Sequence, residues 1–247
     1  MKEYLKKIVI LTIVLTAGHI TVSCDNNDDV LVVVISEERA AEIVATSLAY
    51  NTYGLASNVN HFSTEITNSL DCEEQGSNSG TLDFTSIYGN VTSAFEFTDH
   101  FSKVCDPLDM ISYEVTALHD IDALYFASQQ NVNAQFTVTG LEIGTINEFY
   151  SGLYQREGNW ISKIFNDSFD ITYTMQFNEL NVDKNTSLIV SGTSTFILNV
   201  DYSETSESSN FSGTVTFLNE NEARVDFTNG SSYLLNLETG EINLIQS

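Results

Sequence analysis

The feature that most constrains the fold is a succession of segments, from Thr81 towards the C-terminus, in which apolar and polar residues alternate. In residues 171–177, for example, every second residue from Ile171 to Phe177 is apolar and the residues between are polar. Alternation of period two is typical of strands with one buried face. The connections are short and lack a helical pattern, so neighbouring strands are antiparallel, because a parallel crossover needs about a dozen residues or more. We therefore expect an antiparallel meander of roughly ten to thirteen strands with one apolar and one polar face.

Turn sequences rich in glycine, asparagine and aspartate divide these segments. The expected hairpins are at Gly89-Asn90, Glu157-Gly158, Asp183-Lys184-Asn185, Asn229-Gly230 and Thr239-Gly240. The segment 76–80 imitates the GxSxG frame of a nucleophile elbow, but Asn78 occupies the nucleophile position, so we expect a flexible loop. Residues 202–210, which are acidic and rich in serine, are expected to form a flexible hairpin loop.

A helical pattern precedes the β region. Ser36, followed by Glu37 and Glu38, is typical of a helix N-terminus. A serine hydroxyl there accepts from a free backbone N–H group, and the helix dipole stabilises acidic side chains in the first turn. Apolar residues then recur at intervals of three and four, with an interruption at Gly54. We expect two helices, or one bent at Gly54, over residues 36–70 and a β domain over 71–247, with 36–247 forming one folded unit. The predicted fold class is mostly β with an N-terminal helical segment: a large antiparallel β-meander, as a curved sheet or partly open barrel, packed by one or two helices.

Residues 1–29 have the features of an export signal. Three lysines, Lys2, Lys6 and Lys7, precede an apolar run at residues 8–17. This run is too short to span a bilayer as a stable helix. Thr21-Val22-Ser23-Cys24 then resembles the bacterial lipobox, in which the cysteine receives a diacylglycerol and the preceding peptide is removed, although an aliphatic residue is usual at the position of Thr21. We expect residues 1–23 to be a signal peptide, Cys24 to be lipidated and residues 24–35 to be a tether. The alternative is an ordinary signal peptide cut nearby, which leaves Cys24 as a spare thiol.

The polar residues 25–29 behind Cys24 suggest where the anchored chain resides. They resemble the surface-export signal of Bacteroidota lipoproteins, whereas an aspartate at the position of Asp25 implies inner-membrane retention in the enterobacterial pattern. We expect a lipid-anchored protein of the cell envelope, on the outer membrane and exposed at the cell surface. The alternative is its periplasmic face.

The remaining cysteines, Cys72 and Cys105, form an even pair in a chain that leaves the cytosol, and such a pair predicts a disulfide. Closing this loop stabilises the fold by about 3 kcal/mol in the chain-entropy model. A two-cysteine metal site is the alternative, but neither a CxxC spacing nor a nearby histidine pair supports it.

The formal net charge of −25 at pH 7 argues against a nucleic acid partner, because a polyanion repels the phosphate backbone. The acids are distributed along the chain, which favours a solvated, self-repelling surface. Capture of divalent cations at this acidic surface is the alternative.

The sequence contains no metalloprotease, nucleophile-elbow or phosphate-loop motif, and we expect neither an enzyme nor a bound cofactor. His119, Asp120 and Asp122 are the candidate cation site, although a solvated acidic turn also explains them. Arg156 and Trp160 flank Gly158 and are the candidates for a recognition patch. The alternative has Arg156 paired with a surface acid and Trp160 in the core.

Strand and turn segments between residues 149 and 241, such as Leu180-Asn181-Val182-Asp183-Lys184-Asn185-Thr186 and Leu235-Asn236-Leu237-Glu238-Thr239-Gly240, resemble those of uncharacterised Bacteroidota lipoproteins. The resemblance implies an N-terminal helix, a cysteine pair and a long antiparallel β region, and no activity. We expect a non-enzymatic binding or structural module with a protein or glycan partner of unknown identity. One alternative is a carrier or chaperone of an apolar ligand held between sheet and helix, and another is a hydrolase with an unrecognised carboxylate site.

Overall fold

The computed structural model describes residues 35–67, 70–85, 91–105, 109–142, 144–202, 207–228 and 230–245. Within the chain, Val34–Ser247 form one compact unit. The expected signal peptide, the lipidated Cys24 and nearly all of the expected tether lie outside the described residues, and so do Gly89-Asn90 and Asn229 of the expected hairpins.

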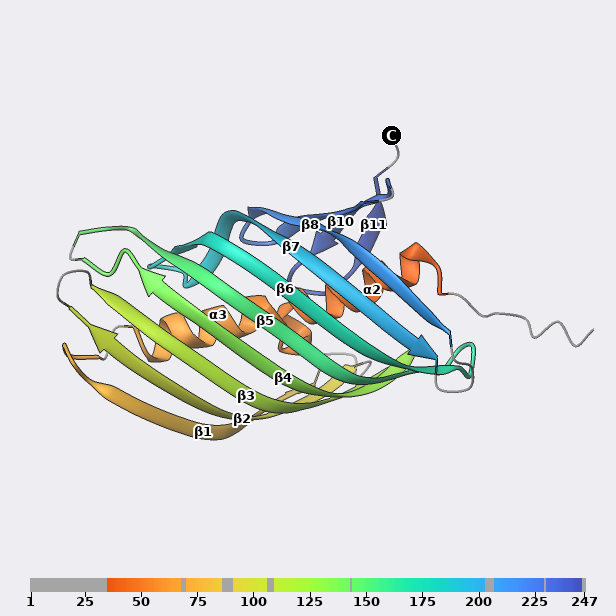
Figure 1. Ribbon diagram of the computed structural model, residues 1–247, viewed down its shortest axis with the longest axis horizontal. Coiled ribbons are helices and arrows are strands. Elements are labelled where there is room, and N and C mark those ends of the chain that lie inside the picture. The colour runs from red at the N-terminus through yellow and green to blue at the C-terminus, as the bar shows by residue number, and fades with distance from the viewer. Residues whose placement is uncertain are drawn as a thin grey trace, which may run out of the picture. The chain divides into compact units, whose positions relative to one another are not determined.

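Over the residues that the structure describes, the β region is one open sheet of eleven strands in which each strand pairs antiparallel with its neighbour in the sequence (Figure 1). The strands are β1 (Gln75–Thr85), β2 (Val91–Val104), β3 (Met110–Ala123), β4 (Phe126–Thr139), β5 (Asn147–Ser162), β6 (Ser168–Asp183), β7 (Leu188–Tyr202), β8 (Ser208–Asn219), β9 (Glu222–Phe227), β10 (Ser232–Asn236) and β11 (Ile242–Leu244). The predicted antiparallel meander is therefore confirmed. The connection from β6 to β7 is a tight turn, as predicted at Asp183-Lys184-Asn185, and the Asp183 carboxylate accepts a hydrogen bond from the Asn185 N–H at 2.7 Å.

Among the described residues, two short helices precede the sheet, as the helical pattern predicts. They are α2 (Glu37–Leu48) and α3 (Leu55–Glu65), joined by the 3-10 turn η1 (Tyr50–Thr52). The Ser36 hydroxyl caps α2 by accepting from the Arg39 N–H at 3.2 Å. A side chain at Gly54 would overlap the backbone of Leu48, so glycine is what permits α3 to begin so close to the end of α2. None of the helices in the described ranges is long and apolar enough to cross a membrane.

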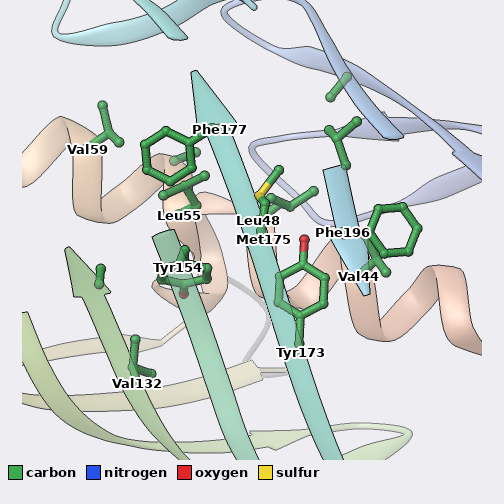
Figure 2. Packing of buried hydrophobic residues seen from close by; sticks show 14 of the residues in the cluster. Val44, Leu48, Leu55, Val59, Val132, Tyr154, Tyr173, Met175, Phe177 and Phe196 are labelled. Carbon is green, nitrogen blue, oxygen red and sulfur yellow. The ribbon is translucent and has the colours of Figure 1, made fainter. Parts of the chain in front are cut away.

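The helices lie along one face of the curved sheet, and the core fills the space between them (Figure 1). Residues of β6 illustrate the pattern: Tyr173, Met175 and Phe177 are buried, whereas Gln176 is exposed on the opposite face. Figure 2 shows Met175 and Phe177 directed towards the helices that carry Leu48 and Leu55. The predicted meander with one helix-covered face and one polar face is confirmed.

Two of the predicted irregular segments are regular strand instead. Residues 76–80, predicted to be a loop, belong to β1, so the sheet begins at Gln75 and not at Thr81. The ring of Phe101 on β2 lies over Gly76 and occupies the space that a side chain there would need. Glu157-Gly158, predicted to be a hairpin turn, lies inside β5, where a side chain on Gly158 would overlap the Gln129 carbonyl of β4. Both glycines mark close packing in the sheet rather than turns.

The predicted loop at residues 202–210 is shorter than expected, because Tyr202 still belongs to β7 and β8 begins at Ser208. The structure joins Cys72 and Cys105 in a disulfide, as the sequence predicts, with 5.6 Å between their Cα atoms. This bridge ties the segment that enters β1 to the residue that follows β2.

Candidate binding site

Arg156, a predicted recognition residue, is fully buried on the helix-covered face of β5. Its guanidinium donates to the carbonyl oxygens of Thr46 at 3.1 Å and Thr52 at 3.3 Å. These carbonyls lie in the last turn of α2 and in η1, where a helix leaves its acceptors unpaired. The predicted pairing of Arg156 with a surface acid is therefore wrong, because the sheet directs this side chain inwards to the helix ends.

No carboxylate pairs with Arg156 in the part of the chain that the structure describes. Burial lowers the pKa of its guanidinium, and the neighbouring hydroxyls of Tyr154 and Tyr173 raise it. The group nevertheless stays protonated, because the unperturbed pKa of arginine is above about 12. The guanidinium carbon lies 5.9 Å from the centre of the Tyr154 ring, so the ring and the helix carbonyl dipoles supply the negative partners.

His119, a predicted cation ligand, is fully buried on β3 and belongs to the same cluster. Its Nδ1 accepts from the Arg156 guanidinium, and its Nε2 lies 2.6 Å from the Ser93 hydroxyl. We assign the imidazole proton to Nε2, because Arg156 can only donate. Burial, together with the charge of Arg156, lowers the pKa of His119 to about 2, so the imidazole is neutral at physiological pH.

Asp120 and Asp122 lie on the opposite face of the sheet from His119, because successive side chains of a strand point in opposite directions. Asp120 accepts from the Gln129 amide at 2.8 Å, and Asp122 pairs with Lys163. The structure therefore does not bring the three predicted ligands together. Over the described residues it contains no group of three or more His, Cys, Asp or Glu side chains that could hold a metal ion.

Trp160 fills the core, as one of the two interpretations of the sequence has it. Its ring stacks on Phe126, with 4.1 Å between centroids and an interplanar angle of 10°. The pair forms the base of an open groove of about 320 Å³ between the first turns of α2 and the turns after β3 and β5. The other large side chains that line the groove are Glu38, Arg39, Glu42, Tyr125, Ile164 and Phe165.

Beside this groove four large apolar side chains are exposed to solvent, and we call them the apolar end. They are Leu124, Tyr125, Ile164 and Phe165, with exposed fractions of 57%, 61%, 60% and 69%. Leu124 and Tyr125 form the turn between β3 and β4, and Ile164 and Phe165 lie in the turn between β5 and β6. Because β4 pairs with β5, the two turns are neighbours, and the Lys163 N–H donates to the Tyr125 carbonyl at 2.9 Å.

Two of the acids around the apolar end are paired with cations, whereas Glu38 and Glu42, which line the groove, have no ion pair among the described residues. Arg39 makes two hydrogen bonds of 2.9 Å to the Asp167 carboxylate, and its guanidinium lies 4.8 Å from the centre of the Phe165 ring. Lys163 pairs with Asp122 and also donates to the Ala123 carbonyl at 2.7 Å. The charges of Asp167 and Asp122 are thus compensated next to these apolar side chains, while those of Glu38 and Glu42 are not.

The outer face of β1 to β5 is hollowed but polar. One groove of about 710 Å³ is lined by outward side chains that include His100, Glu114 and Gln135. Gln135 donates to the Glu114 carboxylate at 3.0 Å, so polar side chains of neighbouring strands hydrogen-bond to one another here. The outer face therefore has the features of a solvated sheet surface.

The space between helices and sheet is closely packed. A hollow between α3 and strands β2 and β3, next to Asn58 and Phe95, measures about 10 Å³. That volume is at the lower limit for a single water molecule. Ligand-sized space thus lies at the surface, in the polar groove of the outer face and in the groove beside the apolar end, and not between helices and sheet. The sequence pattern did not predict the apolar end, because its four residues lie in two turns that only the fold brings together.

Comparisons of the chain with protein-family models, with curated proteins and with solved structures give no match.

Proposed function

We propose that this protein is a lipid-anchored, non-enzymatic binding or structural module of the cell envelope, and that its contact surface is the apolar end. The observation that carries the proposal is that Leu124, Tyr125, Ile164 and Phe165 are exposed side by side next to a groove. Exposed apolar side chains that gather on one surface mark an interaction site, because their contact with water is unfavourable.

The anchor is supported by the lipobox-like sequence that ends at Cys24 and by the polar tether behind it. The membrane position that we propose is the surface of the outer membrane, with its periplasmic face as the alternative. No cofactor is needed for this function, and the partner is one that offers an apolar surface.

The geometry favours a binding role over a catalytic one. His119 is neutral and enclosed by Ser93 and Arg156, and it has no path to a substrate as a general base. The carrier hypothesis needs an apolar cavity between helix and sheet, and the packing of Leu48, Leu55 and Phe177 fills that space.

Two measurements test the proposal. Replacement of Cys24 with Ala should leave the chain unprocessed or soluble, because the thioether forms only on that sulfur. Wild-type recovery of the Cys24→Ala variant in the membrane fraction, without a change in mass, would contradict the anchor.

For the contact surface, a benzophenone amino acid at position 125 in the full chain should form a covalent adduct in cells on irradiation. The matched control is position 146, because Ile146 is equally exposed but lies before β5, at the other end of that strand. An adduct at position 125 and none at position 146 supports the apolar end, whereas the absence of an adduct at position 125 rejects it.

A further inference from the structure

We propose that the apolar end docks on a lipid bilayer, so that Leu124, Tyr125, Ile164 and Phe165 enter the interfacial layer of the membrane that holds the anchor. This inference rests on the proposed function, because it assumes the lipidated Cys24, and it names the partner of the same surface.

The place where the chain enters the folded unit supports this partner. Ser36 and Glu38, at the start of α2, line the same groove as Tyr125 and Phe165. Figure 1 shows the start of α2 and the turn after β5 at the same end of the folded unit. The roughly eleven residues from Cys24 to Ile35 span at most about 40 Å when fully extended. A lipid on Cys24 therefore holds this end of the folded unit within reach of the bilayer.

The tether also favours a membrane over a diffusing protein. The lipid on Cys24 keeps the folded unit within about 40 Å of the anchoring membrane, because that is the greatest length that these residues can span. Docking of the apolar end on the anchoring membrane is then effectively intramolecular, with an effective concentration in the millimolar range. A protein partner has to reach the same side chains from solution, at a much lower concentration.

The side chains of the apolar end match the chemistry of a membrane interface. Each of the two turns presents one aliphatic and one aromatic residue, Leu124 with Tyr125 and Ile164 with Phe165. Aromatic rings and aliphatic side chains of this kind enter the boundary between headgroups and acyl chains, and a tyrosine places its hydroxyl at headgroup level.

Electrostatics point to an uncharged or zwitterionic lipid surface. A chain with a net charge of −25 is repelled by anionic lipids. At the apolar end, however, Asp122 is paired with Lys163 and Asp167 with Arg39. Contact there brings no unpaired charge of Asp122 or Asp167 towards the bilayer, and the unpaired Glu38 and Glu42 of the groove favour a zwitterionic over an anionic surface.

The experiment uses the processed lipoprotein reconstituted into phosphatidylcholine vesicles, with a Tyr125→Cys substitution that carries an environment-sensitive NBD dye. Because Cys24 is lipidated and Cys72 is bridged to Cys105, the new thiol is the one that reacts. We expect the dye at position 125 to shift its emission to the blue and to be quenched by brominated acyl chains. The same dye on the Ile146→Cys variant should remain in water, and a Phe165→Ser substitution should weaken the shift at position 125.

Each outcome decides between the proposals. If the protein floats with the vesicles but the dye at position 125 stays in water, lipid docking is rejected and the anchor stands. If the dye stays in water and the benzophenone at position 125 is joined to a protein in cells, the apolar end binds a protein and lipid docking is again rejected. If the protein does not float with the vesicles, the anchor fails, and the docking that rests on it fails as well.

Discussion

The cluster of Arg156 and His119 and the apolar end are opposite exceptions to the rule that apolar residues are inside and polar residues outside. In the cluster, a charged and a polar side chain are fully buried among aromatic residues. At the apolar end, four large apolar side chains are in water. The two exceptions differ in what the surroundings supply. Helix carbonyls and Ser93 hydrogen-bond to the first, although Arg156 Nε has no partner among the described residues, whereas the second remains largely in contact with water.

This difference separates a structural role from a functional one. A buried polar group costs free energy unless it is hydrogen-bonded, so a satisfied one is part of the architecture. Arg156 ties β5 to the end of α2, and it thereby fixes the helices on the sheet. An exposed apolar cluster contributes no free energy of burial to folding, and it contributes such free energy only when a partner covers it.

The largest effect is expected on removal of the buried cation. Replacement of Arg156 with Met keeps most of the apolar stem but removes the donor to the Thr52 carbonyl and to His119 Nδ1, whereas the Thr46 carbonyl still accepts from the Thr52 hydroxyl at 2.7 Å. We expect the free energy of unfolding to fall by about 3–5 kcal/mol, because each of the two buried acceptors that lose their donor costs about 1–3 kcal/mol. Urea unfolding measures it, with Arg224→Met as the control because Arg224 is an exposed strand residue. Equal losses for the two variants would mean that the cluster does not hold the helices.

The second prediction concerns the apolar side of the same core. Replacement of Phe177 with Ala should reduce the free energy of unfolding by about 3–5 kcal/mol, because a cavity remains beside the helices. Replacement of Gln176 with Ala should cost less than about 0.5 kcal/mol, because that side chain faces water. Similar losses in urea unfolding of the two variants would show that both faces of β6 are buried.

A pH titration of stability isolates His119. Because its pKa in the folded protein is lowered to about 2, the unfolded chain binds a proton near pH 6.5 that the folded chain does not bind. The stability that the neutral imidazole contributes is present above pH 6.5 and is lost as the pH falls below it. We expect a loss of about 2 kcal/mol between pH 7 and pH 5 from this group. In a His119→Gln variant this part of the pH dependence should disappear, and identical pH profiles would contradict the enclosed, neutral imidazole.

The smallest effect on stability is expected at the apolar end. Tyr125→Ser and Phe165→Ser should each change the free energy of unfolding by less than about 0.5 kcal/mol, because both side chains are already in water. Thermal unfolding of the two variants beside Phe177→Ala provides the measurement. A loss comparable with that of Phe177→Ala would show that the apolar end is part of the core, and the contrast with the Arg156 cluster would vanish.

Several features of the fold could be predicted because they depend on local periodicity. Alternation around Met175 and Phe177 predicts the buried face of β6, and Ser36 with Glu37 predicts the start of α2. The disulfide between Cys72 and Cys105 follows from the expectation that the chain leaves the cytosol and that Cys24 is lipidated. Each of these inferences uses residues that are neighbours in the sequence, or the two cysteines that remain when Cys24 is expected to be lipidated.

The candidate sites were predicted less well. His119, Asp120 and Asp122 are adjacent in the sequence, but the alternation that identifies β3 as a strand also places His119 on the opposite face from the two acids. The apolar end has a signal as well, since Leu124-Tyr125 and Ile164-Phe165 are apolar pairs at positions where turns normally carry polar residues. That signal becomes informative only when both turns are known to lie side by side.

The sequence by itself determined the strand and helix types, the sidedness of the sheet and the order of its elements, because periodicity and short connections act within a few residues. The tertiary structure alone decided that Gly158 lies inside β5 under a neighbouring carbonyl, that Arg156 meets the end of α2, and that the turns after β3 and β5 form one exposed surface. These features depend on which residues the register and the curvature of the sheet place opposite one another. Arg156 and Thr46, for example, are 110 positions apart in the sequence. Contacts at such separations arise from the packing of the whole domain, and no short window of sequence contains them.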